Sequence, residues 1–256
     1  MSLKLELRQI NKKFINPGSD TFVINNLSLH VKSGEFVSII GPSGSGKSTV
    51  FNLIGGLIQP DHGSIILDGK EITGERGHIS YMPQQHSLLP WRTVLDNTIL
   101  ALEVSGIMNK KQARIQAKEW LIRVGLAGYE SAYPHVLSGG MQQRVGFLRA
   151  LLSPQEVMCL DEPFGALDAL TRMDMQRWLL SIWEQSRRSV LFVTHSIEEA
   201  LFLSDRIYVF SDKPTQVLEE IKVSFARPRG EDILLHSEFM RLRAHIYSLM
   251  KREVIL

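Results

Sequence analysis

The residues of this chain with the most specific chemistry form one short run. They are Gly41, Pro42, Ser43, Gly44, Ser45, Gly46, Lys47, Ser48 and Thr49, and they match the phosphate-loop pattern in full. Glycines let the backbone wrap closely around phosphate oxygens, with amide N–H groups pointing at the anion. Lys47 would contact the β and γ phosphates, and Ser48 would offer its hydroxyl to Mg²⁺. A flexible linker would not lie between an apolar strand and a helix, so the run predicts a nucleoside triphosphate site of a kinase, a GTPase or an ATPase.

Two adjacent carboxylates follow a second apolar run, Val157 to Leu160. Ligands of open α/β sheets gather at the carboxyl ends of the strands, where Asp161 and Glu162 would stand. Asp161 would hold Mg²⁺, and Glu162 would orient and polarise the attacking water, because phosphoryl transfer depends mainly on positioning. The alternative is a pair of surface acids that begin a turn before Pro163. The phosphate loop in the same chain favours the catalytic interpretation.

A third motif opens a helical pattern shortly before these carboxylates. It reads Leu137, Ser138, Gly139, Gly140, Met141, Gln142, Gln143 and Arg144. A Ser-Gly-Gly start is a second anion-binding helix N-terminus, which one nucleotide could not obviously use together with the phosphate loop of the same subunit. At this point the chain resembles the ATP-binding-cassette (ABC) ATPases, and the run resembles their signature motif. Met141 stands where the broad family has glutamine, which we interpret as the mark of a subfamily.

The resemblance extends to four further positions and implies their roles. Phe14 resembles the aromatic that stacks on adenine, although core packing and Phe22 are alternatives. Gln84 resembles the glutamine that touches Mg²⁺ and senses the transporter. The adjacent Gln85 is the alternative for this position. His195 resembles the histidine that contacts the γ phosphate, and Asp168 lies in a segment that resembles the loop contacting the partner subunit.

The family resemblance also implies a mechanism and partners. Two subunits pair head to tail, so that Ser138, Gly139 and Gly140 bind the γ phosphate of ATP held with Mg²⁺ in the other subunit. Residues 88–97 and 161–172 resemble the importer branch for nitrate, sulfonates, taurine and pyrimidine precursors, although Trp91 could simply be buried. A groove beside Gln84 would receive a short helix of a membrane permease, and a solute-binding protein would deliver the cargo outside. An exporter motor and a non-transport ABC ATPase are the alternatives; a kinase would have no use for the signature run.

The elements that must position these residues indicate an α/β fold. Short apolar runs at 36–40, 157–160 and 189–193 suit parallel strands covered on both faces, and helical patterns at 47–53, 142–152 and 170–184 fall between them. Alternating apolar residues at 3–7 and 27–31 predict an antiparallel layer beside this P-loop core. We expect one ABC ATPase domain over 1–256. A helical subdomain at about 94–152 would be inserted into a core of 1–93 and 153–220, with a helical extension at 221–256 that packs Ile233, Met240, Ile246 and Met250 inward.

Composition narrows the class of protein and its compartment. The 256 residues carry a net charge of +2, which is too weak to indicate a nucleic acid or an anionic membrane as partner. Cys159 is the single cysteine, so an intrachain disulfide is excluded and a small buried hydrophobe is expected there. No signal-peptide pattern and no run of about 20 apolar residues is present. We expect a peripheral protein on the cytoplasmic face of the membrane.

Overall fold

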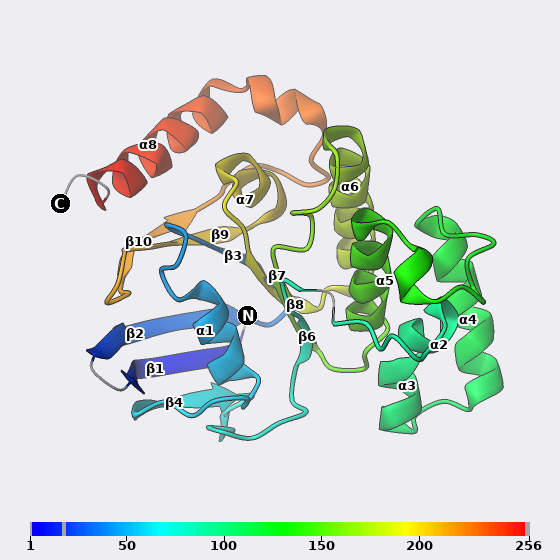
Figure 1. The fold of residues 1–256 in the computed structure, drawn as a ribbon. Coiled ribbons are helices and arrows are strands. Elements are labelled where there is room, and N and C mark those ends of the chain that lie inside the picture. Colours follow the sequence, from blue (N-terminus) through cyan, green and yellow to red (C-terminus); the bar gives the residue numbers. More distant parts are fainter. Residues whose placement is uncertain (1, 17–18, 86, 254–256) are drawn as a thin grey trace.

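The structure is a computed structural model that describes residues 2–16, 19–85 and 87–253. Two β-sheets and two groups of helices make up the fold (Figure 1). Pro17 and Gly18, two residue types typical of turns, lie outside the described residues.

The larger sheet has six strands in the order β10, β9, β3, β8, β7, β6. Its strands are β3 (Phe36–Ile40), β6 (Ser80–Met82), β7 (Val157–Asp161), β8 (Ser189–Val193), β9 (Arg206–Phe210) and β10 (Val217–Lys222). Every neighbouring pair is parallel except the antiparallel pair of β9 and β10. All residues of β3, β7 and β8 are buried, so the prediction of covered parallel strands is confirmed.

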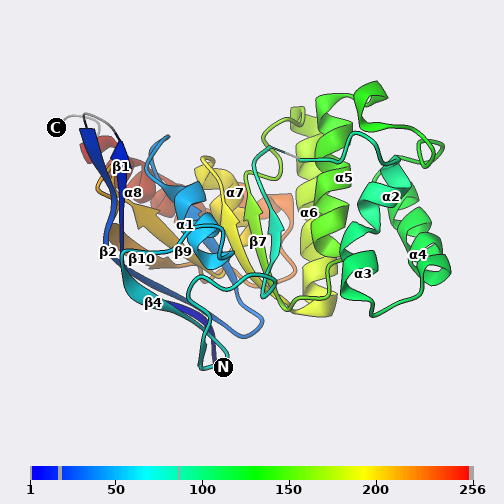
Figure 2. The ribbon, with the colours of Figure 1, turned by 60° about the horizontal axis from the view of Figure 1, so that its bottom comes forward.

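Some helices pack against the larger sheet, and others lie beyond one end of it. They are α1 (Lys47–Ile54), α2 (Val94–Thr98), α3 (Leu100–Ser105), α4 (Lys110–Arg123), α5 (Gly139–Leu151), α6 (Ala169–Ser186), α7 (Ile197–Leu203) and α8 (Ser237–Glu253), with 3₁₀ turns at Pro134–Val136 and Glu231–Leu235. Figure 2 shows α2 to α5 gathered at the end of the molecule farthest from β1 and β2. Over the described ranges, none of these helices combines the length and apolar character needed to cross a bilayer.

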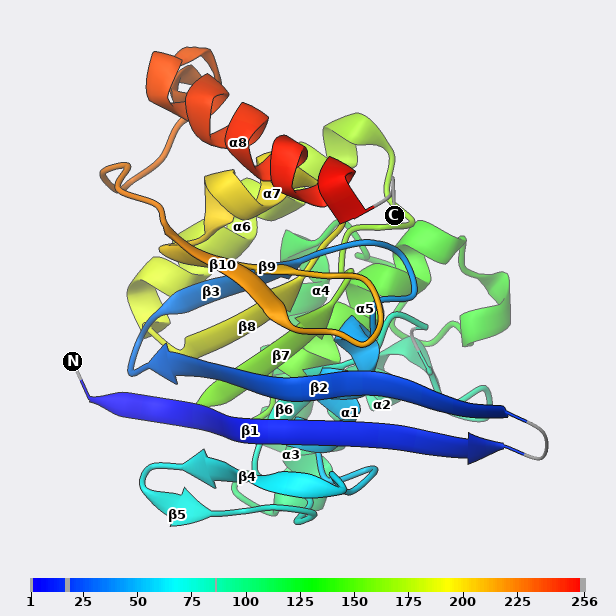
Figure 3. The ribbon, with the colours of Figure 1, turned by 90° about the vertical axis from the view of Figure 1, so that its left-hand side faces the viewer.

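The smaller sheet is the predicted antiparallel layer. Its order is β2, β1, β4, β5 (Figure 3), and its strands are β1 (Leu3–Asn16), β2 (Ser19–Lys32), β4 (His62–Leu67) and β5 (Lys70–Glu71). Leu5, Leu7 and Leu29 face inward and pack in one cluster with α1, which lies between the two sheets. Amphipathic alternation thus places one face of this sheet on the core.

Two helices begin earlier than the sequence pattern predicts, because polar residues cap them. The predicted start of α5 was Gln142, but Ser138 accepts a hydrogen bond from the N–H of Met141 at 3.3 Å, and the helix begins at Gly139. Asp168 likewise accepts from Thr171 N–H at 3.0 Å at the start of α6. Each cap satisfies a helix-end N–H group that would otherwise lack a partner.

The C-terminal helix α8 packs against α7 and β9 through one face. Phe239, Leu242 and Ile246 are buried in that contact, and Met250 lies against it. The predicted inward packing of Met240 is wrong, since this side chain is 48% exposed. At 3.6 residues per turn, neighbours in the sequence point to different faces, and Phe239 occupies the inward position.

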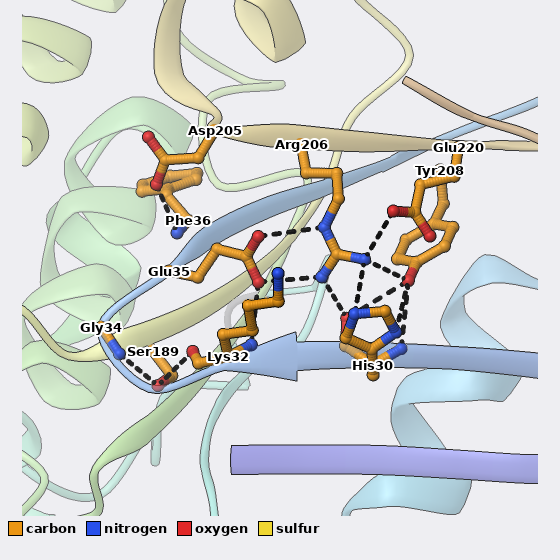
Figure 4. A network of polar contacts seen from close by, with 10 residues as sticks. All are labelled: His30, Lys32, Gly34, Glu35, Phe36, Ser189, Asp205, Arg206, Tyr208 and Glu220. Carbon is orange, nitrogen blue, oxygen red and sulfur yellow. Dashed lines mark hydrogen bonds and ion pairs between the residues drawn. The ribbon is translucent and has the colours of Figure 1, made fainter. Parts of the chain in front are cut away.

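A buried ionic network joins the two sheets where β2 approaches β9 (Figure 4). Arg206 on β9 donates to both carboxylate oxygens of Glu35, at 2.9 and 2.8 Å. Its Nη1 donates to His30 Nε2 on β2 at 3.0 Å and to the hydroxyl of Tyr208 at 2.6 Å, and it pairs with Glu220 at 3.0 Å. Such pairing is what a buried cation requires.

Candidate active site

The phosphate-loop run connects β3 to α1 at the carboxyl end of the parallel strands. Gly44 and Gly46 adopt φ values of +79° and +96°, which L side chains rarely take. A Cβ atom at Gly46 would lie 2.9 Å from Cγ1 of Val23, so a larger residue there would also collide with β2. The hydroxyl of Thr215 donates to the carbonyl of Ser45 and ties the loop to the segment after β9. Sequence and packing therefore fix the loop in one shape.

Lys47 is buried beneath its own loop. Its Nζ donates to the carbonyl oxygens of Gly41 and Pro42, at 3.0 and 2.7 Å. Burial lowers the pKa of this ammonium group, while the charges of Glu162 and Asp161 act in the opposite direction. The result is a cation held by loop carbonyls at the floor of the site.

A cavity of about 390 Å³ opens beside this loop. Its walls are Phe14, Thr21, Val23, Ser43, Gly44, Gly46, Lys47, Ser48, Thr49, Gln84, Glu162 and Lys213. Phe14, rather than Phe22, is the aromatic candidate among these described wall residues, and it is 36% exposed. Gln84, rather than Gln85, reaches the cavity as well. The structure thus gathers an aromatic ring, the phosphate loop and a carboxylate around one space.

Asp161 ends β7 and is 2% exposed. The side chain of Ser48 acts on its carboxyl group and favours the charged form. Burial raises the pKa of Asp161, and the charge of Glu162 adds to this effect, while Ser48 and Lys47 lower the pKa. The second carboxyl oxygen, Oδ2, is buried without a hydrogen-bond partner among the described residues. A hydroxyl and an unsatisfied carboxylate oxygen are hard oxygen donors, so this pair fits Mg²⁺.

Glu162 meets two of the other predicted residues. Its Oε2 accepts a hydrogen bond from Nε2 of Gln84 at 3.1 Å and lies 3.4 Å from Nδ1 of His195. The backbone of Glu162 has φ +47°, and its N–H donates to the carbonyl of Val193 on β8 at 3.0 Å. Two segments far from Glu162 in the sequence therefore reach its carboxylate at the wall of the cavity.

Buried hydrogen bonds hold the backbone on both sides of His195. The hydroxyl of Thr194 donates to Glu199 at 2.5 Å and accepts from the N–H of Ser196 at 3.0 Å. Gln176 donates to the other carboxylate oxygen of Glu199 at 3.0 Å. The imidazole itself keeps 67% of its surface exposed. The backbone of His195 is thus held in place, while its ring is exposed and can contact a ligand.

The signature residues do not line this cavity. Ser138 and Gly139 are exposed at the start of α5, and Gly140 is half-buried. Asp168 is exposed at the start of α6. The structure therefore places these four residues on surfaces outside the nucleotide cavity of their own chain.

Four residues at or beside the site could not be recognised from their sequence context. Thr21, Val23 and Lys213 line the cavity, although each stands in an unremarkable segment. Gln143 contacts the loop that follows β7, although it lies within the signature run. The apolar alternation predicted a strand only at 27–31, so it gave no indication that the earlier part of β2 borders the cavity.

Comparison with known proteins decides the family. Residues 24–165 match the family model described as ABC transporter. The chain belongs to the ABC transporter family. It is an ATP-binding subunit of that family and hydrolyses ATP, and the predicted P-loop core with an antiparallel layer and helical insertion is the family's fold.

Two curated relatives and one solved structure illustrate the similarity. A formylaminopyrimidine import ATP-binding protein of Halalkalibacterium halodurans is 49% identical over 80% of each chain. An aliphatic sulfonates import ATP-binding protein of Bacillus thuringiensis is 39% identical over 95% of this chain and 94% of the relative. A dimeric ATP-binding cassette in a post-hydrolysis state with ADP and Pi has a TM-score of 0.78 at 33% identity, covering 87% of this chain and 100% of that one.

Proposed function

We propose that this ABC ATPase powers the import of a small solute through a membrane permease. The observation that carries the ATPase half is the Glu162 carboxylate, which lies between Gln84 and His195 at the wall of the phosphate-loop cavity. The import half is supported by relatives named for formylaminopyrimidine and aliphatic sulfonate import. The proposed cargo is of the nitrate, sulfonate, taurine or pyrimidine-precursor type, and these two relatives support its sulfonate and pyrimidine-precursor members.

The roles of the residues follow from their positions. The loop from Gly41 to Thr49 would wrap the phosphates with its N–H groups, and the ammonium of Lys47 would exchange its carbonyl partners for the β and γ phosphates. Phe14 would stack on adenine at the other end of the cavity. Glu162 would orient the attacking water, and His195 would contact the γ phosphate from its exposed ring.

The residues around Asp161 would hold Mg²⁺. Ser48 and Asp161 supply a hydroxyl and a carboxylate with one unsatisfied oxygen, and Gln84 would add its amide oxygen. Bound there, Mg²⁺ would neutralise charge on the phosphates. Gln84 already donates from Nε2 to Glu162, which leaves its oxygen as the atom able to bind a cation.

A second copy of the chain would complete each ATP site. Ser138, Gly139 and Gly140 present a capped helix start outside their own cavity, as a site for the γ phosphate of the partner's ATP requires. Asp168 would contact the partner subunit. Two of the solved cassettes that are similar to this chain are described as dimeric. We therefore propose a homodimer with two ATP molecules at its interface.

The groove for the permease would adjoin the ATP site. A cavity of about 520 Å³ is lined by Gln84, Gln85, Ser87, Leu88, Pro90, Pro134, His135 and Gln142. Gln84 belongs to this groove and to the nucleotide cavity, so a helix seated in the groove would touch a residue that touches Glu162. Trp91, beside the groove residue Pro90, is 72% exposed. A solute-binding protein would act on the outer side of the membrane.

The division of the chain follows from this arrangement. We propose one ABC ATPase domain over 1–256, with residues 94–152 as a helical subdomain inserted into a core of 1–93 and 153–220. Residues 221–256 would form a C-terminal extension. The protein would attach to the cytoplasmic face of the membrane through the permease.

Affinity purification tests the proposal. Tagged Glu162→Gln protein is purified from native membranes with MgATP, and its partners are identified by mass spectrometry. A polytopic permease of import type, with or without a solute-binding protein, is expected. Lys47→Ala protein treated identically is the control for nucleotide-dependent capture. An export-type permease would favour an exporter motor, and soluble partners alone would overturn the transport assignment.

A further inference from the structure

The side chain of Gln143 is buried between α5 and the loop that joins β7 to α6. Only 2% of the residue is exposed. Its Nε2 donates to the backbone carbonyl of Glu162 at 3.0 Å, and its Oε1 accepts from the N–H of Ala166 at 2.9 Å. Both ends of one amide are thus satisfied by backbone atoms of the loop that carries Glu162. A residue that merely filled space would need neither bond.

These bonds act on a backbone that needs outside support. Glu162 has φ +47°, a conformation that persists in a residue other than glycine only when its surroundings hold it. Its N–H is held by Val193 on β8, and its carbonyl is held by Gln143 and by the N–H of Gly165 at 3.1 Å. The direction of the Glu162 side chain follows from this backbone, so Gln143 contributes to where the carboxylate points.

The first turn of α5 packs on the same loop. A Cβ atom at Gly140 would lie 3.2 Å from Cδ2 of Leu167 and 3.5 Å from the carbonyl oxygen of Ala166. The Ser-Gly-Gly start of α5 therefore packs closely on this loop. Gln143, which lies five residues after Ser138, is hydrogen-bonded to the same loop. A shift of this helix relative to β7 would strain both contacts together, because the interior is close-packed.

We propose that Gln143 is a positioning residue that ties the catalytic Glu162 to the signature helix of its own subunit. Its role as a link between the two ATP sites rests on the head-to-tail dimer proposed above. In that dimer, Ser138 contacts the partner's nucleotide, and the Gln143 amide transmits the resulting position of α5 to the backbone of Glu162. Its role in aligning Glu162 applies to each chain by itself.

Two substitutions separate this role from simple packing. Gln143→Met keeps the length of the side chain and removes both hydrogen bonds. Gln143→Glu keeps an acceptor for Ala166 but sets an oxygen against the carbonyl of Glu162. The matched control is Gln155→Met, which removes a glutamine that donates to the carbonyl of Gly77 at 3.1 Å in loops outside the nucleotide cavity.

Steady-state hydrolysis of MgATP by the full chain is the first measurement. We expect both Gln143 variants to lose about tenfold to a hundredfold in kcat with KM within about twofold of wild type, the effect of misplacing a catalytic group from a distance. Hydrogen exchange of the peptide over 162–168 should become faster in Gln143→Met and stay unchanged in Gln155→Met. An unchanged kcat in Gln143→Met, or an equal loss in Gln155→Met, would overturn the proposal.

Gel filtration of Glu162→Gln and of Gln143→Met/Glu162→Gln with MgATP tests the dimer separately. If both dimerise, Gln143 acts on hydrolysis and not on assembly, as expected. Failure of the double variant alone would show that Gln143 serves the interface and would overturn the positioning role. Monomers in both samples would contradict the proposed dimer. The kcat values would still decide whether Gln143 aligns Glu162.

Discussion

Among single residues, Glu162 is contacted by three other segments of the chain. Gln84 donates to its carboxylate, His195 lies 3.4 Å away, and Gln143 holds its backbone carbonyl. Positioning accounts for most of the catalysis in phosphoryl transfer. We therefore expect hydrolysis to be far more sensitive than ATP binding to a change at this carboxylate.

Replacing Glu162 by Gln should separate these two steps. The amide keeps an oxygen that can accept from Gln84 but is a much weaker base for water, so phosphate release should fall by about 10²–10⁴-fold. ATP binding measured by calorimetry should remain, and MgATP should produce a dimer on gel filtration. Glu119→Gln, on the exposed surface of α4, serves as the control. A variant that hydrolyses ATP at the wild-type rate would remove Glu162 from the mechanism.

The residues whose place in the site could be predicted from the sequence are those positioned by their own local backbone. The phosphate loop and the pair Asp161 and Glu162 follow strands that the apolar pattern reveals. Lys213 and Gln143 could not be assigned, because their contacts arise from packing between distant segments. A pattern within one segment carries no information about which other segment it will meet.

At the scale of elements, helix starts and buried faces depend on individual side chains. Ser138 and Asp168 extend α5 and α6 beyond their predicted starts by capping them. Helix propensity alone predicts that glycine and aspartate lie in loops. A capped helix start nevertheless contains both residue types, because the cap satisfies the first N–H groups. On α8, Phe239 and not Met240 faces the core, since a shift of one position turns a side chain by about 100°.

The two neighbours on α8 should differ sharply in their contribution to stability. Phe239 is 1% exposed, so Phe239→Ala should lower the free energy of unfolding by about 3–5 kcal/mol through lost burial and a cavity. Met240→Ala should change it by less than about 0.5 kcal/mol because the side chain is half exposed. Urea unfolding followed by circular dichroism measures both. Equal effects would contradict the assignment of Phe239, rather than Met240, to the buried face of α8.

At the scale of the whole molecule, the Arg206 network fastens one sheet to the other. Burial lowers the pKa of His30, and the positive charges of Arg206 and Lys32 act in the same direction, while Glu220 and Glu35 oppose it. The neutral ring accepts from Arg206 through Nε2, and protonation would end that bond. The apolar alternation of β2 predicted the strand, but its polar positions gave no sign that one of them joins the second sheet.

This network should give the fold a measurable pH dependence. With a lowered pKa in the folded chain, the unfolded chain binds the His30 proton first as pH falls. Stability should therefore decrease as pH drops below about 6.5, the ordinary histidine value. His30→Gln, which keeps an acceptor for Arg206, should show a shallower loss between pH 7.5 and 5.5 in urea unfolding. His62→Gln, at the exposed start of β4, should retain the wild-type slope, and a wild-type slope in His30→Gln would refute the account.

The nucleotide cavity has walls from both sheets. Phe14 comes from the antiparallel sheet, Lys47 from the helix between the sheets, and Lys213 from the segment after β9 of the parallel sheet. A ligand in contact with all three would connect the two sheets. A ligand that binds the folded chain but not the unfolded chain adds about 2.7 kcal/mol to the free energy of unfolding at a hundredfold excess over Kd. Nucleotide bound across these walls would therefore stabilise the contact between the two sheets, so that the ATP which drives the protein would also support its fold.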